Sequence, residues 1–138
     1  MSEEDRTGTY RGGCLCGAVR YLVTAEPLNV RLCHCRLCRK ATGQPFFARA
    51  AWAREAVVIE GETAGYNSSS DLVRRFCPTC GTGLFAQRQS RPDLLSITLG
   101  SLDDPSRIKP AMHIWTSSQM DWLTFDDGLP RYEQGAPA

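Results

Sequence analysis

Seven cysteines constrain this 138-residue chain more than any other feature, because they fall into groups of four and three. The group of four consists of two close pairs that lie far apart in the sequence, Cys14 with Cys16 and Cys77 with Cys80. The group of three lies within one short segment and consists of Cys33, Cys35 and Cys38. A structural zinc site takes four protein ligands, whereas a catalytic zinc site takes three and leaves one position open. The grouping therefore predicts one zinc that stabilises the fold and a second zinc that can hold a substrate.

Composition and charge indicate a single globular domain. Hydrophobic residues make up 42% of the chain and charged residues 22%, which is enough to build a core. No apolar run approaches the ~20 residues that cross a bilayer, and the polar, acidic residues 1–6 do not resemble a secretory signal. We therefore expect a cytoplasmic protein, in which clustered cysteines indicate metal binding or catalysis rather than disulfides. The formal net charge of +1 gives no global field that would attract nucleic acid or a membrane.

Alternating apolar residues predict short strands with one buried face. Two sets show this alternation most clearly: Val19, Tyr21 and Val23, and Leu95, Ile97 and Leu99. Residues 46–52 and 57–60 are further candidate strands. Residues 36–41 and 117–123 each predict a helical turn, the second N-capped by Ser117 or Ser118. We expect a mostly β fold of small stacked antiparallel sheets, stapled by zinc, with few helical turns. Residues 8–132 would form one zinc-binding β domain between flexible ends at 1–7 and 133–138.

The spacing of the two cysteine pairs suits a single metal ion. Cys77 and Cys80 form a zinc-knuckle pattern in which one tight turn aims both sulfur atoms at one ion, and Gly81 accepts the positive φ that such a turn requires. Cys14 and Cys16 share a face of an extended segment. An ion that joins both pairs would pin the N-terminal hairpin to the second half of the sheet. The alternatives are buried cysteines without a metal and a disulfide between Cys77 and Cys80.

The group of three can also converge on one ion. Cys33 and Cys35 share a face, and Cys38 follows at C-x-x-C spacing. An open fourth position would accept an incoming thiol, because a thiol that binds a metal is deprotonated. One alternative is a closed structural site with His113 as the fourth ligand. Others are a redox trio and a nucleophilic cysteine paired with His34.

Residues outside the cysteine groups are open to two interpretations each. His113 is either a proton carrier near neutral pH or a hydrogen-bonded structural histidine. Trp115 and Trp122 could line a pocket above the second zinc, but we expect both in the core, together with the aromatic pair Phe46 and Phe47. Arg36, Arg39 and Lys40 could steer an anionic thiol to the second zinc or form a solvated basic turn. Tyr132 is expected to pack against the sheet.

The order of the motifs resembles a known family. The segments that carry the resemblance are GCLCGAVRY at 13–21, CHCRLCRKATG at 33–43, FCPTCGTGL at 76–84, GSLDDP at 100–105, HIW at 113–115, Trp122 and Leu129-Pro130. Together they are similar to the glutathione-dependent formaldehyde-activating enzyme family, which includes centromere protein V, over residues 8–132. The resemblance implies a β-tent fold, with a structural zinc on the group of four and a second zinc on the group of three. It also implies condensation of formaldehyde with glutathione to S-hydroxymethylglutathione.

The favoured hypothesis is a zinc-dependent carbon–sulfur lyase-type enzyme that acts on a thiol adduct of glutathione and an aldehyde. Its catalytic residues would be Cys33, Cys35 and Cys38, which hold the catalytic zinc, and His113. The alternative is a non-enzymatic zinc-binding module for a protein partner. Nucleic-acid or microtubule binding, as for centromere protein V, is disfavoured because the balanced charge supplies no basic stripe. Neither a membrane partner nor an oligomeric state is indicated.

Overall fold

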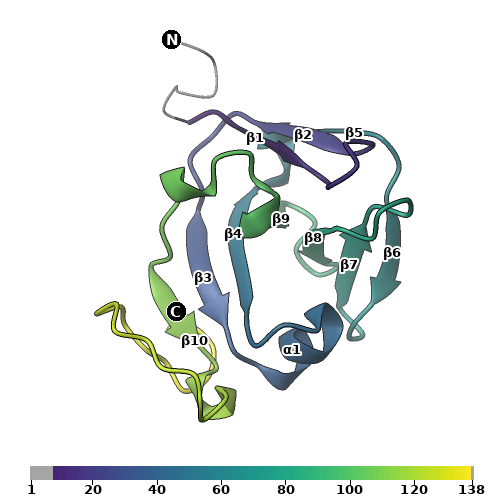
Figure 1. Cartoon of the computed structure of the whole chain (residues 1–138). Helices are drawn as coiled ribbons and strands as arrows, with labels where there is room; N and C mark the ends of the chain where they lie inside the picture. Colours follow the sequence, from purple (N-terminus) through teal and green to yellow (C-terminus); the bar gives the residue numbers. More distant parts are fainter. Residues whose placement is uncertain (1–7, 138) are drawn as a thin grey trace.

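The computed structural model describes residues 8–137, so the flexible segment predicted at residues 1–7 lies outside the described residues. The strands form a three-stranded sheet in the order β1-β2-β5 and a seven-stranded sheet in the order β10-β3-β4-β9-β8-β7-β6. The small sheet lies across one end of the large one, and α1 lies at the other end (Figure 1). The fold is therefore mostly β, as predicted. Neighbouring strands pair antiparallel, except that β10 pairs parallel with β3.

The small sheet contains β1 (Tyr10–Gly13), β2 (Arg20–Val23) and β5 (Val57–Glu60). The large sheet contains β3 (Asn29–Cys33), β4 (Phe47–Ala53), β6 (Ala64–Asn67), β7 (Leu72–Phe76), β8 (Gly83–Arg88), β9 (Leu94–Thr98) and β10 (Met112–Ile114). The α-helix is α1 (Arg36–Thr42), and the short 3-10 turns are η2 (Arg54–Ala56), η3 (Leu99–Ser101), η4 (Pro105–Arg107) and η5 (Thr116–Ser118). Within residues 8–137, no helix is both long and apolar enough to span a bilayer.

The main core lies between the two sheets. The alternating residues predicted from the sequence are buried, with Val19, Tyr21 and Val23 on one side and Leu95, Ile97 and Leu99 on the other. Trp52 of β4 is fully buried in this cluster, where its ring centroid lies 5.7 Å from that of Tyr10. Its indole N–H donates to the Ala25 carbonyl at 2.9 Å, so the one polar atom of the ring is satisfied.

The opposite face of the large sheet carries a different set of side chains. Because successive residues of a strand point to opposite faces, Arg31 and Cys33 of β3 share the face that lies away from Trp52. The register places Arg31 opposite Arg49 and Cys33 opposite Phe47 on β4. This second face therefore combines arginines with one of the predicted metal ligands.

The predicted helical turn after Cys35 is confirmed and is bounded at both ends. Cys35 is the N-cap of α1, and its sulfur accepts a hydrogen bond from the Cys38 amide at 3.2 Å. Gly43 ends the helix at φ 70°, and its N–H donates to the Arg39 carbonyl at 2.8 Å. A left-handed residue at this position is a common helix terminator, and glycine adopts it without a steric cost.

The helical turn predicted at 117–123 is wrong. The structure has a single 3-10 turn, η5, which begins one residue earlier, and its N-cap Trp115 makes no side-chain capping bond. Ser117 does not cap a helix, because its hydroxyl donates to the Glu133 carbonyl at 2.7 Å. Hydrogen bonds to the C-terminal segment thus replace the helix, and the Trp115 amide likewise donates to Gln134. The flexible end predicted at 133–138 stays a prediction, with residue 138 outside the described residues.

Candidate metal centres

The four cysteines predicted to share one ion lie together. The sulfur atoms of Cys14, Cys16, Cys77 and Cys80 are all within 4.8 Å of one another. They come from the segment between β1 and β2 and the segment between β7 and β8, so this quartet joins the small sheet to the large one. Gly81 has φ 81°, as the knuckle pattern predicts, and its N–H donates to the Cys77 carbonyl at 2.8 Å.

Hydrogen bonds to three of the four sulfur atoms of the quartet, those of Cys14, Cys77 and Cys80, favour the thiolate form. The Val19 amide donates to the Cys14 sulfur at 3.2 Å, and the Cys80 amide lies 3.5 Å from the Cys77 sulfur. The Thr82 hydroxyl, 3.2 Å from the Cys80 sulfur, lowers the pKa of that thiol to about 5. Metals bind the deprotonated form of cysteine. Four such donors suit a closed tetrahedral site, and zinc is the common occupant of four-cysteine sites.

The three remaining cysteines form a second group. The sulfur atoms of Cys33, Cys35 and Cys38 lie within 4.8 Å of one another, and no histidine or carboxylate of residues 8–137 joins them. Cys33 is the last residue of β3, Cys35 is the N-cap of α1, and Cys38 is a buried residue of the first turn of α1. The turn from strand to helix therefore brings the trio together. Hydrogen bonds from Cys33 and Cys38 lower the pKa of the Cys35 thiol. All seven cysteines are free of disulfides.

The trio lines a cavity of about 280 Å³ on the arginine-bearing face of the large sheet. Its basic lining residues are Arg31, Arg49, Arg74, Arg88 and Arg91. No aspartate or glutamate of the described residues lines it. Buried Arg74 connects this basic lining to the trio, because its guanidinium donates to the Cys38 sulfur at 3.3 Å. The same guanidinium lies 5.0 Å from the ring centroid of Phe47, so Arg74 and Phe47 form a cation–π pair.

A larger cavity of about 540 Å³ adjoins the first. Arg74 and Phe47 line both cavities, so these two side chains form the wall between them. The larger cavity is bounded by further aromatic residues, Phe46, Phe76 and Phe85 among them. The cavity that the trio lines is therefore rich in arginine, whereas the adjoining cavity combines aromatic residues with Arg74 and Arg75. The basic residues of α1 line neither of these two cavities. They are Arg36, Arg39 and Lys40.

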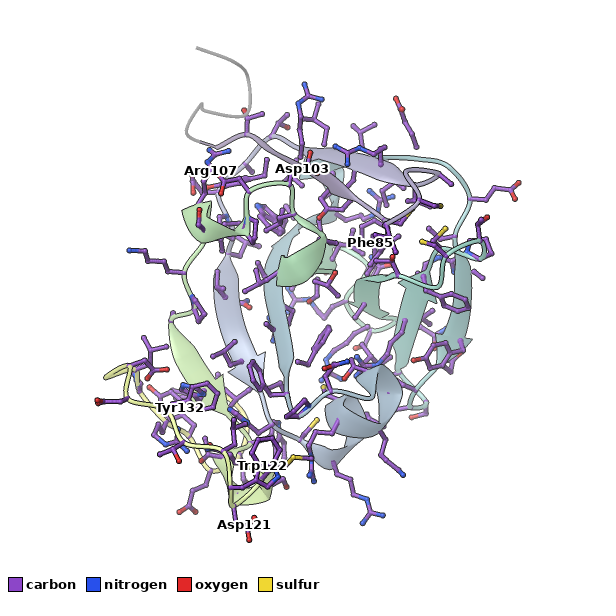
Figure 2. The ribbon with its side chains drawn as sticks, viewed as in Figure 1. Phe85, Asp103, Arg107, Asp121, Trp122 and Tyr132 are labelled. Atoms are coloured by element: carbon purple, nitrogen blue, oxygen red, sulfur yellow. The ribbon has the colours of Figure 1, made fainter. Side chains whose placement is uncertain are left out.

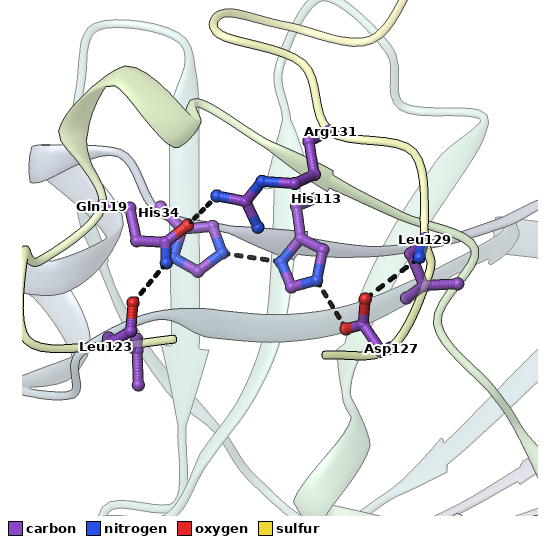
Figure 3. Close-up of polar contacts among 7 residues, drawn as sticks. All are labelled: His34, His113, Gln119, Leu123, Asp127, Leu129 and Arg131. Carbon is purple, nitrogen blue, oxygen red and sulfur yellow. Dashed lines mark hydrogen bonds and ion pairs between the residues drawn. The ribbon is translucent and has the colours of Figure 1, made fainter. Parts of the chain in front are cut away.

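His113 lies in a buried chain of hydrogen bonds (Figure 3). Its Nδ1 is 2.9 Å from Nε2 of His34, and its Nε2 is 2.7 Å from a carboxylate oxygen of Asp127. If His113 is neutral and donates to Asp127, its Nδ1 accepts from His34, and a neutral His34 then has an unprotonated Nδ1. That nitrogen is buried without a hydrogen-bond partner. Burial, and then the neighbouring His113, lower the pKa of His34 to about 4, which agrees with a neutral ring.

The structure thus gives His113 two partners that the sequence spacing did not suggest. Both of its ring nitrogens are engaged, it does not belong to the trio's ligand group, and it lines neither cavity. These contacts agree with a structural histidine, which is one of its three predicted roles, whereas the predicted role of fourth ligand to the trio is not supported by the grouping. Its catalytic role stays a prediction.

The prediction that both tryptophans lie in the core is wrong. Trp115 is 38% exposed and Trp122 66% exposed. Trp115 has φ 57°, and it lines the trio cavity. Trp122 lies on the C-terminal segment beside the end of β10, and Tyr132 packs against the trio's apolar surroundings (Figure 2). Phe47 is buried as predicted, whereas Phe46 is partly buried and packs against His34.

The basic lining is the part of the site that sequence reasoning missed. Residues i and i+2 of a strand share a face, so the sequence alone could have placed Arg31 on the same face as Cys33. The pairing of Arg31 with Arg49 depends on strand register, and the approach of Arg74 to Cys38 joins residues 36 positions apart.

Comparisons with known proteins agree on one family. The family model described as glutathione-dependent formaldehyde-activating enzyme matches residues 9–118. A Halomonas elongata protein named "Putative glutathione-dependent formaldehyde-activating enzyme" is 27% identical over 125 residues, covering 83% of this chain and 80% of that protein. An "uncharacterized lyase" of Schizosaccharomyces pombe is 36% identical over 76 residues, which are 55% of this chain. This chain spans only 56% of the length of that relative.

A crystal structure of a Rhodobacter sphaeroides protein has the same fold, with a TM-score of 0.58 at 24% identity. The match covers 88% of this chain and 98% of that chain. This structural likeness supports the fold alone. The family assignment rests on the family model, which covers most of the described residues. The chain belongs to the glutathione-dependent formaldehyde-activating enzyme family.

Proposed function

We propose that this protein is a zinc-dependent carbon–sulfur lyase-type enzyme that joins a small thiol, glutathione in the first instance, to formaldehyde. The reaction adds the thiol across the carbonyl group: a carbon–sulfur bond forms, the carbonyl π bond breaks, and the thiol proton ends on oxygen. No oxidant or reductant is needed. The observation that carries the proposal is the convergence of Cys33, Cys35 and Cys38 beside a cavity, with no fourth ligand among the described residues.

The two cysteine groups would have different tasks. Cys14, Cys16, Cys77 and Cys80 would hold a structural zinc between the two sheets. Cys33, Cys35 and Cys38 would hold a second zinc, which supplies a Lewis acid and lowers the pKa of a bound thiol. Three thiolates on one side of a cavity suit an ion that keeps one position open.

The chain's own residues prepare the trio for this task. The Arg74 guanidinium donates to Cys38 and so offsets negative charge that gathers on three adjacent sulfur atoms. The Cys38 amide donates to Cys35, which orients that sulfur toward its neighbours. Phe47 and Ile114 pack around the trio and limit the access of water from the sheet side. These contacts orient the ligands before a substrate arrives.

Two matched variants separate the tasks of the two groups. We expect the wild type to hold two zinc ions per chain. Cys38→Ser should retain one zinc, stay folded and lose turnover of formaldehyde with glutathione. Cys80→Ser should lose cooperative folding, because structural zinc sites contribute on the order of 10 kcal/mol of apparent binding free energy. Mild chelation should remove about half of the zinc without unfolding the domain.

The outcomes against the proposal are specific. A Cys38→Ser protein that keeps both zinc ions and full turnover would remove the trio from the chemistry. Wild-type protein that holds two zinc ions but shows no turnover with any small thiol would leave the alternative of a zinc-binding module for a protein partner.

A further inference from the structure

The basic face beside the trio brings two like charges together, and no carboxylate of the described residues lines the cavity there. Arg31 and Arg49 stand directly opposite each other on β3 and β4. Like charges in this position destabilise a sheet. Burial, and then the charge of Arg31, lower the pKa of Arg49 to about 10, and the opposing effect of the Cys33 and Cys38 sulfur atoms offsets only part of this shift. A stable protein is expected to keep such a pair only where something else benefits from it.

No ion pair within the described residues neutralises Arg31 or Arg49. In the described part of the chain, the ion pairs of this basic lining join Arg88 to Asp71 at 3.7 Å and Arg91 to Asp93 at 3.0 Å. Arg49 donates instead to the neutral side chain of Asn29. The Nε atom of Arg31 is buried and has no hydrogen-bond partner. Guanidinium groups placed in this way can bind a carboxylate or phosphate group with two parallel hydrogen bonds.

The position of the pair relative to the trio limits what can bind there. Arg31 lies two residues before Cys33 on the same strand face, and all of these residues line one cavity of about 280 Å³. A cavity of this size accepts a small molecule and not a folded partner. A molecule whose sulfur reaches the trio would therefore have its other groups beside Arg31 and Arg49. The adjoining aromatic cavity, beyond Arg74, is also lined by Arg75, whose guanidinium donates to the hydroxyl and the carbonyl of Thr63.

We propose that Arg31 and Arg49 form an anion-binding site that selects the substrate of the neighbouring trio, and that this substrate is a small thiol carrying two or more oxyanion groups. The identity of the reacting thiol rests on the proposed function, whereas anion binding is measurable without turnover. No carboxylate of the described residues lines the cavity, so an ammonium group on the substrate would have no carboxylate partner there. A polyanionic thiol without an ammonium group should therefore bind at least as well as glutathione.

Three probes separate the contributions of thiol and anion. Mercaptosuccinate carries one thiol and two carboxylates, succinate carries the carboxylates alone, and 2-mercaptoethanol carries the thiol alone. Inorganic phosphate distinguishes a site for phosphate groups from one for carboxylates. We expect succinate or phosphate to bind the zinc-loaded wild-type protein, with an affinity that falls as salt is added. Mercaptosuccinate should bind more tightly than either succinate or 2-mercaptoethanol.

Arg31→Gln and Arg49→Gln should each weaken binding of the anion by about 10-fold or more, which is the size expected for a lost charged hydrogen bond. Arg36→Gln is the matched control, because it removes the same charge from α1 outside the cavity lining, and it should change the affinity by less than about 2-fold. Arg49→Lys, which keeps the charge without the planar fork, should recover part of the loss. Arg31→Gln should not lower the thermal midpoint, because it removes a repulsion. Added anion should raise the midpoint of the wild type more than that of this variant.

Two results would overturn the inference. One is equal anion affinity in Arg49→Gln, Arg36→Gln and wild type. The other is loss of zinc in Arg49→Gln with unchanged anion binding, which would mean that the arginines only balance the thiolates. The inference and the proposed function fail separately. Turnover of glutathione with an unchanged KM in Arg49→Gln would contradict the anion-binding site but not the enzymatic function. Anion binding without turnover of any thiol would contradict the enzymatic function but not the anion-binding site.

Discussion

Replacing His113 by alanine would test whether this residue serves the fold or the second metal. The side chain is fully buried and makes two hydrogen bonds, at 2.9 Å to His34 and 2.7 Å to Asp127. His34 is also fully buried, and its Nδ1 has no hydrogen-bond partner. His113→Ala would therefore leave a second ring nitrogen of His34 without its partner.

The magnitude follows from these contacts. A buried polar atom that loses its partner costs about 1–3 kcal/mol. Removal of most of a buried imidazole adds roughly 1–2 kcal/mol for lost packing. The Asp127 carboxylate is 33% exposed and can be rehydrated, so it adds little. We expect the free energy of unfolding to fall by about 2–5 kcal/mol, which is a large part of the about 5–15 kcal/mol of a typical domain.

Denaturant-induced unfolding combined with metal analysis provides the assay. Asp127→Asn keeps an acceptor for the His113 ring and should cost about 1 kcal/mol or less. His113→Gln can replace part of the hydrogen bonding but is a poor zinc ligand, so it should retain two zinc ions per chain if His113 is structural. A His113→Gln protein that keeps its stability but holds only one zinc would refute the reasoning. It would show that His113 closes the second site.

Two further predictions concern the fold. Burial, followed by the hydrogen bond to Glu26, raises the pKa of Tyr10 to about 12, so its stabilising contribution is present below pH ~10 and is lost as the pH rises toward 12. Ultraviolet titration of phenolate should show the ionisation of Tyr10 near pH 12 in the wild type, and Tyr10→Phe should lack this step. A Tyr10 that titrates at its ordinary value would contradict the effect of burial and of Glu26. Gly61→Ala should cost about 2–5 kcal/mol, because φ is 97° and a Cβ would lie 2.1 Å from the Ala18 carbonyl oxygen. Gly128→Ala, at φ 69° with no atom within 4 Å, should cost only about 1–2 kcal/mol in the same unfolding assay, and equal losses would show that the contact with Ala18 is unimportant.

The cysteine pairs and the trio could be predicted from the sequence because the geometry within each of them is local, whereas the meeting of the two pairs of the quartet depends on the fold. Cys77 and Cys80 lie in one tight turn, and Cys35 and Cys38 lie in one helical turn, so the spacing of the residues sets the separation of the sulfur atoms. The strands around Tyr21 and Ile97 were likewise visible, since their alternation reports a buried face directly. Each of these features needs only a few consecutive residues.

Features that depend on contacts across the chain could not be predicted in this way. The helical turn expected at 117–123 is displaced because Ser117 bonds to a carbonyl 16 positions away. Trp115 and Trp122 were expected in the core because large apolar side chains usually are. Their exposure follows from the path of the C-terminal segment, and a backbone with φ 57° at Trp115 has no signature in the sequence.

The arginine pair shows how a conflict between local rules and the fold can indicate function. Taken alone, β3 and β4 each read as ordinary strands in which Arg31 and Arg49 could point into solvent. Only the register brings the two charges face to face, and only the topology places them beside Cys33. The arrangement disfavours folding on balance, because the pair repels and Arg49 is desolvated, and the nearby Cys33 and Cys38 sulfur atoms offset only part of this cost. The energy that such a pair costs in the free protein is recovered when an anion enters between the two guanidinium groups, so the same repulsion that weakens the sheet strengthens binding of the substrate.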